Sequence, residues 1–164
     1  MVKVIGFCAS CQKSGKTTLL LKLLESLHRR GTKTAVIKHA HHLDVDEDKD
    51  STRFAAAGAS CAMVVSPQGW VLEAKPSEEL PLDKAIAIIS SLSGCDVLLI
   101  EGYKDGDIPK IAVCRSDVSL KLPCAENDLL AVVSDTPVDT GLPRFDLNHD
   151  VEAICDFIMT LEDI

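Results

Sequence analysis

The sequence predicts a three-layer α/β fold with a mostly parallel sheet, and two patterns indicate this class. Short apolar segments typical of strands alternate with longer segments in which apolar residues recur at helical spacing. The strand segments, residues 96–100 among them, carry no polar face, as is typical of parallel strands that are covered on both sides. The chain has 164 residues, the length of one ordinary domain, so we expect a single domain over residues 1–164.

Local patterns predict the elements of the first half of the chain. Residues 3–9 form a β-prone run that ends in a polar turn. Leucines then recur at i, i+3, i+4 and i+7, which predicts an amphipathic helix over residues 17–30 that Gly31 ends. The elements expected next are a strand at 34–38, a short helix at 51–57 and a β-hairpin with strands at 61–65 and 70–73.

The second half continues the α/β pattern. Its expected elements are a helix at 82–92, strands at 96–100, 111–114 and 129–133, and an amphipathic helix at 151–161. The hairpin in the first half interrupts this alternation of strands and helices. We therefore expect an α/β domain into which a hairpin is inserted.

The composition argues against several functional classes. With 17 basic and 25 acidic residues the formal net charge is −8, so most of the surface would repel nucleic acids and anionic membranes. Apolar stretches are too short for a signal peptide or a membrane-spanning helix, so we expect a cytoplasmic protein. The seven cysteines lie mostly in apolar runs, which indicates reduced core residues. Cys8 and Cys11 form a C-x-x-C, but in a context that disfavours redox chemistry.

The turn after the first strand carries the most informative motif. Residues 10–17 have the sequence S-C-Q-K-S-G-K-T, the phosphate-loop pattern G-x-x-x-x-G-K-[ST] with serine in the first glycine position. Gly15 allows close backbone approach, Lys16 would reach the β- and γ-phosphates, and the Thr17 hydroxyl would bind Mg²⁺. The predicted nucleotide-binding residues of this loop are Gln12, Lys13, Ser14, Gly15, Lys16, Thr17 and Thr18.

An acid at the end of a later strand completes the expected metal site. The strand at 96–100 delivers Glu101 to the carboxyl edge of the sheet, where ligands bind in open α/β folds. We expect Glu101 to contact Mg²⁺ directly or through water, and Lys16 and Glu101 to act in any nucleotide hydrolysis. Together with the strand pattern, the loop and this acid predict a fold of the P-loop NTPase type.

Histidines and acids crowd residues 39–50, and several interpretations stay open here. An EF-hand beginning at Asp44 fails, because its sixth position is lysine instead of glycine. His39 and His41 could bind zinc, although no further pattern completes the ligand set. The segment could instead lie near the γ-phosphate, with Asp50 in the outer shell of the metal, or be a solvated acidic loop.

Asp135 is a candidate for reading the base. It follows the strand at 129–133, at a position where many nucleotide-binding α/β folds contact the base. A carboxylate there can accept hydrogen bonds from N1 and N2 of guanine, which would favour GTP over ATP. The alternative is a polar exit from the strand.

These motifs, taken in order, resemble those of the molybdopterin-guanine dinucleotide biosynthesis protein B (MobB) family. The resemblance covers nearly the whole chain and rests on the phosphate loop, residues 37–42, 49–51 and 57–59, and the E-G-Y-K sequence at 101–104. It implies a homodimeric GTP-binding protein with at most weak GTPase activity, which assists the guanylyltransferase (MobA) that attaches GMP to molybdopterin. Gly15, Lys16 and Thr17 would be phosphate and Mg²⁺ residues, Glu101 the Walker-B-like acid, and Asp50 a residue near the γ-phosphate. The hairpin is our candidate for the dimer contact.

Two other functions use the same loop. A small-molecule kinase or a dethiobiotin-synthetase-like ligase would transfer the γ-phosphoryl group to a substrate, usually under an arginine-rich lid. The chain has five arginines, two of them at the end of the first helix, and no arginine-rich segment. The third possibility is a binding module that hydrolyses nothing.

Overall fold

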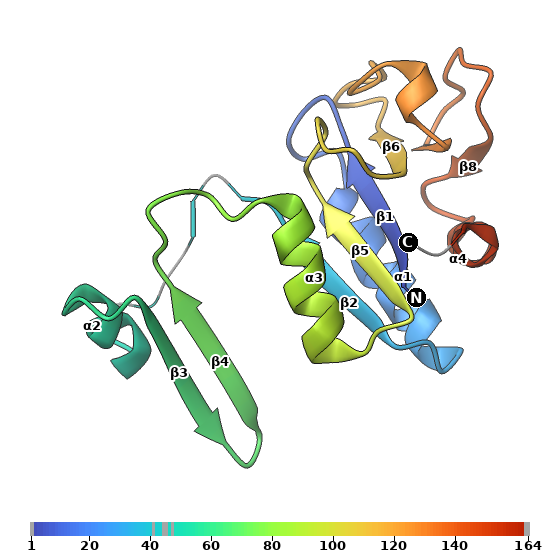
Figure 1. The fold of residues 1–164 in the computed structure, drawn as a ribbon. Helices are drawn as coiled ribbons and strands as arrows, with labels where there is room; N and C mark the ends of the chain where they lie inside the picture. Colours follow the sequence, from blue (N-terminus) through green and yellow to red (C-terminus); the bar gives the residue numbers. More distant parts are fainter. Residues whose placement is uncertain (1, 41, 44–45, 47, 163–164) are drawn as a thin grey trace. The chain divides into compact units, whose positions relative to one another are not determined.

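Two compact units make up the computed structural model of the chain, which describes residues 2–40, 42–43, 46 and 48–162 (Figure 1). The first unit comprises the segments up to His39 and from Leu82 onward, and the second comprises Ala40–Pro81. Such a division does not show whether each unit folds alone. The single domain expected over residues 1–164 therefore stays a prediction.

A parallel sheet forms the centre of the first unit. Its strands lie in the order β2 (Thr34–Lys38), β5 (Val97–Glu101), β1 (Lys3–Cys8), β6 (Lys110–Cys114), β7 (Ala131–Ser134) and β8 (Arg144–Asp146). Each neighbouring pair runs parallel. The mostly parallel sheet is thus confirmed. Strand β8 is an addition to the sequence prediction, because three residues with a charge at each end show no recognisable strand pattern.

Helices cover both faces of this sheet. They are α1 (Lys16–Arg29), α3 (Leu82–Ser93) and α4 (Val151–Thr160). Ile5 and Phe7 of β1 belong to the core that contains α1 and α4, whereas Val4 belongs to a second core with Ile86 and Ile89 of α3. Successive strand residues point to opposite faces, so the sheet is the middle of three layers, as predicted (Figure 1). Among the described residues, none of the helices is long and apolar enough to cross a membrane.

Loops replace helices between β5 and β8, where only the 3₁₀ helix η1 (Glu126–Asp128) occurs. The first of these loops lies against β1 at Gly6. A Cβ atom on residue 6 would lie 2.9 Å from Cδ1 of Ile108 and 3.1 Å from Cγ of Lys110. The missing side chain at Gly6 lets Ile108 cover the sheet directly. In this part of the chain a loop therefore packs on the sheet where a helix would otherwise lie.

The second unit contains the predicted hairpin and one helix. Strands β3 (Cys61–Ser66) and β4 (Gly69–Ala74) pair antiparallel, and α2 (Asp50–Ala56) packs against both. The Thr52 hydroxyl of α2 donates a 2.9 Å hydrogen bond to Oε2 of Glu73 in β4. Six large apolar side chains of the hairpin are nevertheless exposed: Met63, Val64, Val65, Trp70, Val71 and Leu72. The inserted hairpin is confirmed, and much of its apolar surface lies outside any core.

Four of the seven cysteine side chains are buried. Cys8, Cys95, Cys114 and Cys155 are buried, as the sequence predicts for core residues. Burial, together with the nearby Cys124, raises the pKa of the Cys8 thiol to about 12. Cys8 is therefore a neutral thiol near pH 7 and a poor nucleophile, which argues against redox chemistry at the C-x-x-C.

We expect Gly6→Ala to lower the free energy of unfolding by about 1–3 kcal/mol, because the added Cβ must displace Ile108 or Lys110 in a packed region. Urea denaturation measures the change. The control is Gly141→Ala, whose Cβ would meet Oε1 of Glu126 at an ordinary 3.5 Å and should change stability by less than about 0.5 kcal/mol. Equal stabilities of the two variants would contradict the packing of the loop on β1.

Candidate functional site

The phosphate loop joins β1 to α1 in the expected strand–loop–helix order. Two of its residues have left-handed backbones, Lys13 with φ 62° and Gly15 with φ 88°. Gly15 is also the N-cap of α1, which begins at Lys16, and its carbonyl accepts a 2.9 Å hydrogen bond from the N–H of Leu19. Alternating backbone handedness of this kind turns successive N–H groups toward one point. With the positive end of the helix dipole behind it, the loop is suited to an anion.

Lys16 lies folded over this loop. Its ammonium donates a 3.2 Å hydrogen bond to the hydroxyl of Ser14, which is buried. Its side chain is half-buried, whereas Gln12, Lys13, Thr17 and Thr18 are exposed. The structure therefore brings the predicted loop residues together around one concave backbone turn. Their nucleotide-binding roles stay predictions.

Thr17 and Glu101 meet across the edge of the sheet. The Thr17 hydroxyl lies 2.9 Å from Oε1 and 3.0 Å from Oε2 of Glu101, the last residue of β5. The hydroxyl hydrogen faces the carboxylate, so the lone pairs of the Thr17 oxygen are left for another ligand. One hydroxyl and one carboxylate are hard oxygen donors of the kind that Mg²⁺ takes alongside water and nucleotide phosphates. The two residues thus fit the predicted metal site.

Lys38 is a member of this cluster that the sequence reasoning did not assign to it. It ends β2, and its ammonium lies 3.7 Å from Oε2 of Glu101. Lys38 and Glu101 are directly paired in the parallel register of β2 and β5. The only signal in the sequence was that both residues end predicted strands, which does not say that the strands are neighbours.

The residues that follow Lys38 and Glu101 also touch. The rings of His39 and Tyr103 are stacked, with centroids 4.4 Å apart and planes inclined by 24°. Gly102, which joins Glu101 to Tyr103, has φ 100°, and a Cβ atom on residue 102 would lie 3.0 Å from Cβ of His39. Tyr103 itself has φ 48°, an uncommon conformation outside glycine. A strained turn therefore follows the acid of the site directly.

Asp135 holds a neighbouring loop. Its carboxylate accepts two 2.8 Å hydrogen bonds from Ser116, one from the backbone N–H and one from the hydroxyl. The backbone N–H of Ser116 is the main cause that lowers the pKa of the Asp135 carboxyl below its usual value. The same loop reaches the phosphate loop, since the Ser10 hydroxyl donates to that of Ser119 at 3.0 Å. Asp135 thus has a structural contact, and its role in base recognition stays a prediction.

The predicted residues of the histidine-rich segment belong to different units, because His39 lies in the first unit and Asp50 in the second. Asp50 begins α2 in the second unit, 3.5 Å from Nη1 of Arg53, and its role near the γ-phosphate stays a prediction. Of the two zinc candidates, His39 stacks on Tyr103 and His41 lies outside the described residues, as does Asp44. Within the described part of the chain, no group of three or more His, Cys, Asp and Glu residues is placed to hold a metal ion.

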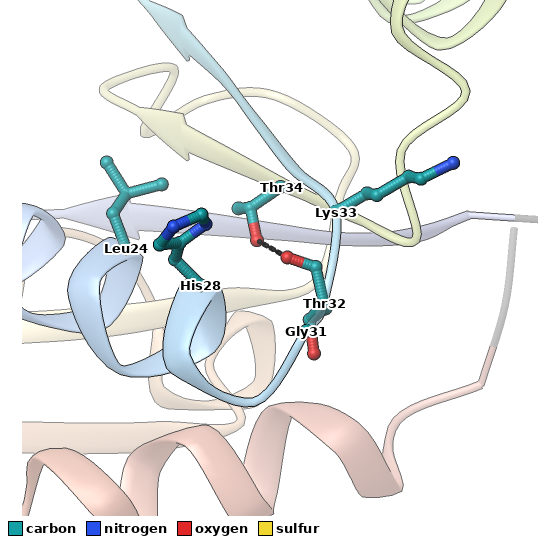
Figure 2. A pocket seen from close by; sticks show the side chains of 6 residues that line it. All are labelled: Leu24, His28, Gly31, Thr32, Lys33 and Thr34. Carbon is teal, nitrogen blue, oxygen red and sulfur yellow. Dashed lines mark hydrogen bonds between the residues drawn. The ribbon is translucent and has the colours of Figure 1, made fainter.

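A shallow hollow of about 420 Å³ lies at the opposite edge of the sheet (Figure 2). It is lined by the end of α1 and the start of β2, namely Leu24, His28, Gly31, Thr32, Lys33 and Thr34. The one hydrogen bond drawn there joins the Thr34 hydroxyl to the carbonyl of Thr32, at 3.4 Å. None of the predicted site residues lines this hollow, so it is separate from the cluster around Glu101.

Comparison with known proteins places the chain in a family. A family model described as molybdopterin guanine dinucleotide synthesis protein B (MobB) matches residues 4–135, well over half of the chain. The chain belongs to the MobB family. The matched span begins in β1 and ends at Asp135, so it contains all predicted site residues. The resemblance seen in the sequence motifs is thus confirmed.

Individual relatives agree with this membership. The chain is 36% identical to the molybdopterin-guanine dinucleotide biosynthesis adapter protein of Escherichia coli K12 over 164 residues, 97% of this chain and 93% of that protein. It is 36% identical to the adapter protein of Haemophilus influenzae over 147 residues, 88% and 82% of the two chains. The crystal structure of Bacillus subtilis MobB superposes with a TM-score of 0.76 at 24% identity, covering 99% of each chain, and so supports the fold.

The left-handed backbone at Lys13 of this MobB protein predicts an unusual order of variant stabilities. We expect Lys13→Gly to be at least as stable as the wild type, because glycine adopts φ 62° without a steric penalty. Lys13→Val should be less stable by about 1–2 kcal/mol, since a β-branched residue is strongly disfavoured there. Both variants lose the same charge, so the difference between their free energies of unfolding in urea measures the cost of the left-handed backbone conformation. Equal stabilities would contradict this loop conformation.

Proposed function

We propose that this chain binds Mg²⁺–GTP and acts as an adapter in the synthesis of molybdopterin guanine dinucleotide, assisting the guanylyltransferase that attaches GMP to molybdopterin. The observation that carries the proposal is the phosphate loop with the Thr17 hydroxyl on Glu101 at the carboxyl edge of the sheet. Membership of the MobB family and the names of the Escherichia coli and Haemophilus influenzae relatives support the pathway.

The residues of the site suggest how the nucleotide would be held. The N–H groups of the loop would bind the phosphates, and Lys16 would leave the Ser14 hydroxyl to contact the β- and γ-oxygens. Thr17 and Glu101 would hold Mg²⁺, which would offset the negative charge of the phosphates. The metal would neutralise charge on the phosphates, while the residues of the chain would hold the metal and the phosphates in position.

Weak GTPase activity is the form of hydrolysis that this arrangement favours. A strong GTPase needs a group that orients the attacking water. Glu101 is poorly placed to take the proton of that water, because its carboxylate already accepts a hydrogen bond from the Thr17 hydroxyl and faces the Lys38 ammonium. Lys16 and Glu101 would therefore act mainly by positioning and electrostatics.

The arginines weigh against a kinase or a dethiobiotin-synthetase-like ligase. Arg29 and Arg30 at the end of α1 pair with Glu152 of α4, at 3.0 and 2.5 Å. Arg115 pairs with Asp117 at 2.9 Å. These three guanidinium groups are engaged in ion pairs within the chain, and the sequence has no arginine-rich segment that could form a lid, which supports the adapter over an enzyme that transfers the phosphoryl group.

Nucleotide titration tests the proposed function. In Mg²⁺ we expect GTP to bind more tightly than ATP, and Lys16→Ala to weaken GTP binding at least about tenfold, because a charged contact to phosphate is lost. Isothermal titration calorimetry measures both affinities. The control is Lys22→Ala, an exposed lysine on the same helix, which should keep wild-type affinity. ATP binding as tight as GTP would contradict the guanine assignment, and full affinity in Lys16→Ala would contradict the loop assignment.

The exposed hairpin supports a homodimer. Val64 of β3 pairs with Val71 of β4, and both side chains are exposed along with their apolar neighbours. An exposed apolar strand pair is prone to association, and a two-fold contact would bury the same surface of both copies.

We expect Val71→Glu to convert a dimer to a monomer in size-exclusion chromatography with light scattering, because a charge would be buried in the contact. Gln68→Glu adds the same charge at the exposed turn of the hairpin and serves as the control. Circular dichroism should show both variants folded, since residue 71 is exposed in the single chain. A dimer that persists in Val71→Glu would exclude the hairpin as its main contact.

A further inference from the structure

Lys38 forms an ion pair with the acid of the proposed metal site. Its ammonium lies 3.7 Å from Oε2 of Glu101, whose side chain is only 12% exposed. The lysine side chain is 54% exposed, so its head group is free to move through solvent. The contact thus joins a fixed, nearly buried carboxylate to a flexible surface cation.

The backbone keeps this pair together. Lys38 and Glu101 are partners in the parallel register of β2 and β5, and the N–H of His39 donates a 2.9 Å hydrogen bond to the Glu101 carbonyl. The position of the lysine at the edge of the site is therefore set by the sheet. Only the end of its side chain has freedom.

A divalent cation at Thr17 and Glu101 would change the balance of charges. The Thr17 hydroxyl donates its hydrogen to Glu101, which leaves its oxygen to bind a metal beside the carboxylate. A Mg²⁺ ion there would lie within a few ångströms of the Lys38 ammonium, and like charges at that distance repel. Since Glu101 is nearly buried and held by Thr17, the exposed lysine is the partner that would give way.

The released lysine would have a new partner in the same place. A nucleoside triphosphate bound to the phosphate loop extends its terminal phosphate toward the Mg²⁺ site, at the edge where β2 and β5 end. We propose that Lys38 and Mg²⁺ compete for the Glu101 carboxylate, and that metal loading transfers Lys38 to the terminal phosphate of the nucleotide. This inference rests on the proposed function, and it makes Lys38 a sensor of the third phosphate.

The competition has two measurable consequences in Lys38→Gln. With GDP, which offers Lys38 no third phosphate, the Mg²⁺ concentration for half-maximal nucleotide binding should fall about three- to fivefold, the range for one exposed charge pair. At saturating Mg²⁺ the preference for GTP over GDP should fall about tenfold, because a charged contact to the third phosphate is lost. Fluorescent GTP and GDP analogues report both values. Mn²⁺ binding to the nucleotide-free protein, followed by electron paramagnetic resonance, should tighten in the same variant.

Lys33→Gln is the matched control. Lys33 directly precedes β2 at the opposite edge of the sheet, is exposed, and loses the same charge on substitution. It should keep wild-type Mg²⁺ dependence and GTP preference, whereas Lys38→Arg should retain most of both because the charge stays. Thermal melting should show all variants folded.

The outcomes separate the two proposals. Wild-type binding of Mg²⁺–GTP with Lys38→Gln indistinguishable from Lys33→Gln would overturn the role of Lys38 and leave the proposed function standing. A wild-type protein that binds no nucleotide would overturn both. A lower Mg²⁺ requirement together with a lost preference for GTP over GDP, both restored in Lys38→Arg, would establish the exchange.

Discussion

The parallel pairing of β5 with β1 on one side and β2 on the other is the constraint on which the site depends. In this register Glu101 lies opposite Phe7 of β1 and Lys38 of β2. Because parallel strands end at one edge of a sheet, the phosphate loop, the acid and the lysine meet there. A slip of one residue in β5 would turn Glu101 to the other face, away from Thr17.

The site at this edge also depends on particular backbone conformations. Gly102 leaves room for His39, and Gly6 leaves room for the loop that crosses β1. Lys13 and Tyr103 hold left-handed conformations in the segments that carry Thr17 and Glu101. Strain of this kind persists where the surrounding structure imposes it, and it is frequent at binding sites. Both chain segments that carry the candidate metal ligands thus contain a residue in a strained conformation.

Local charge at the edge differs from that of the whole protein. The formal net charge is −8, yet Lys38 pairs with Glu101 at this edge, and the phosphate loop carries Lys13 and Lys16. A phosphate group would be repelled by most of the surface and attracted here. The acidic composition therefore restricts where an anion could bind, without preventing binding at this edge.

The sequence by itself determined the class of the fold, the phosphate loop and the hairpin, because these depend on patterns within a few residues: apolar runs, the spacing of Gly15 to Thr17, and a turn ending at Gly69. The pairing of Glu101 with Lys38, the hold of Asp135 on Ser116, and strand β8 were decided only by the tertiary structure. Each joins segments that no local pattern connects, and the packing of side chains on the two faces of the sheet selects which strands become neighbours.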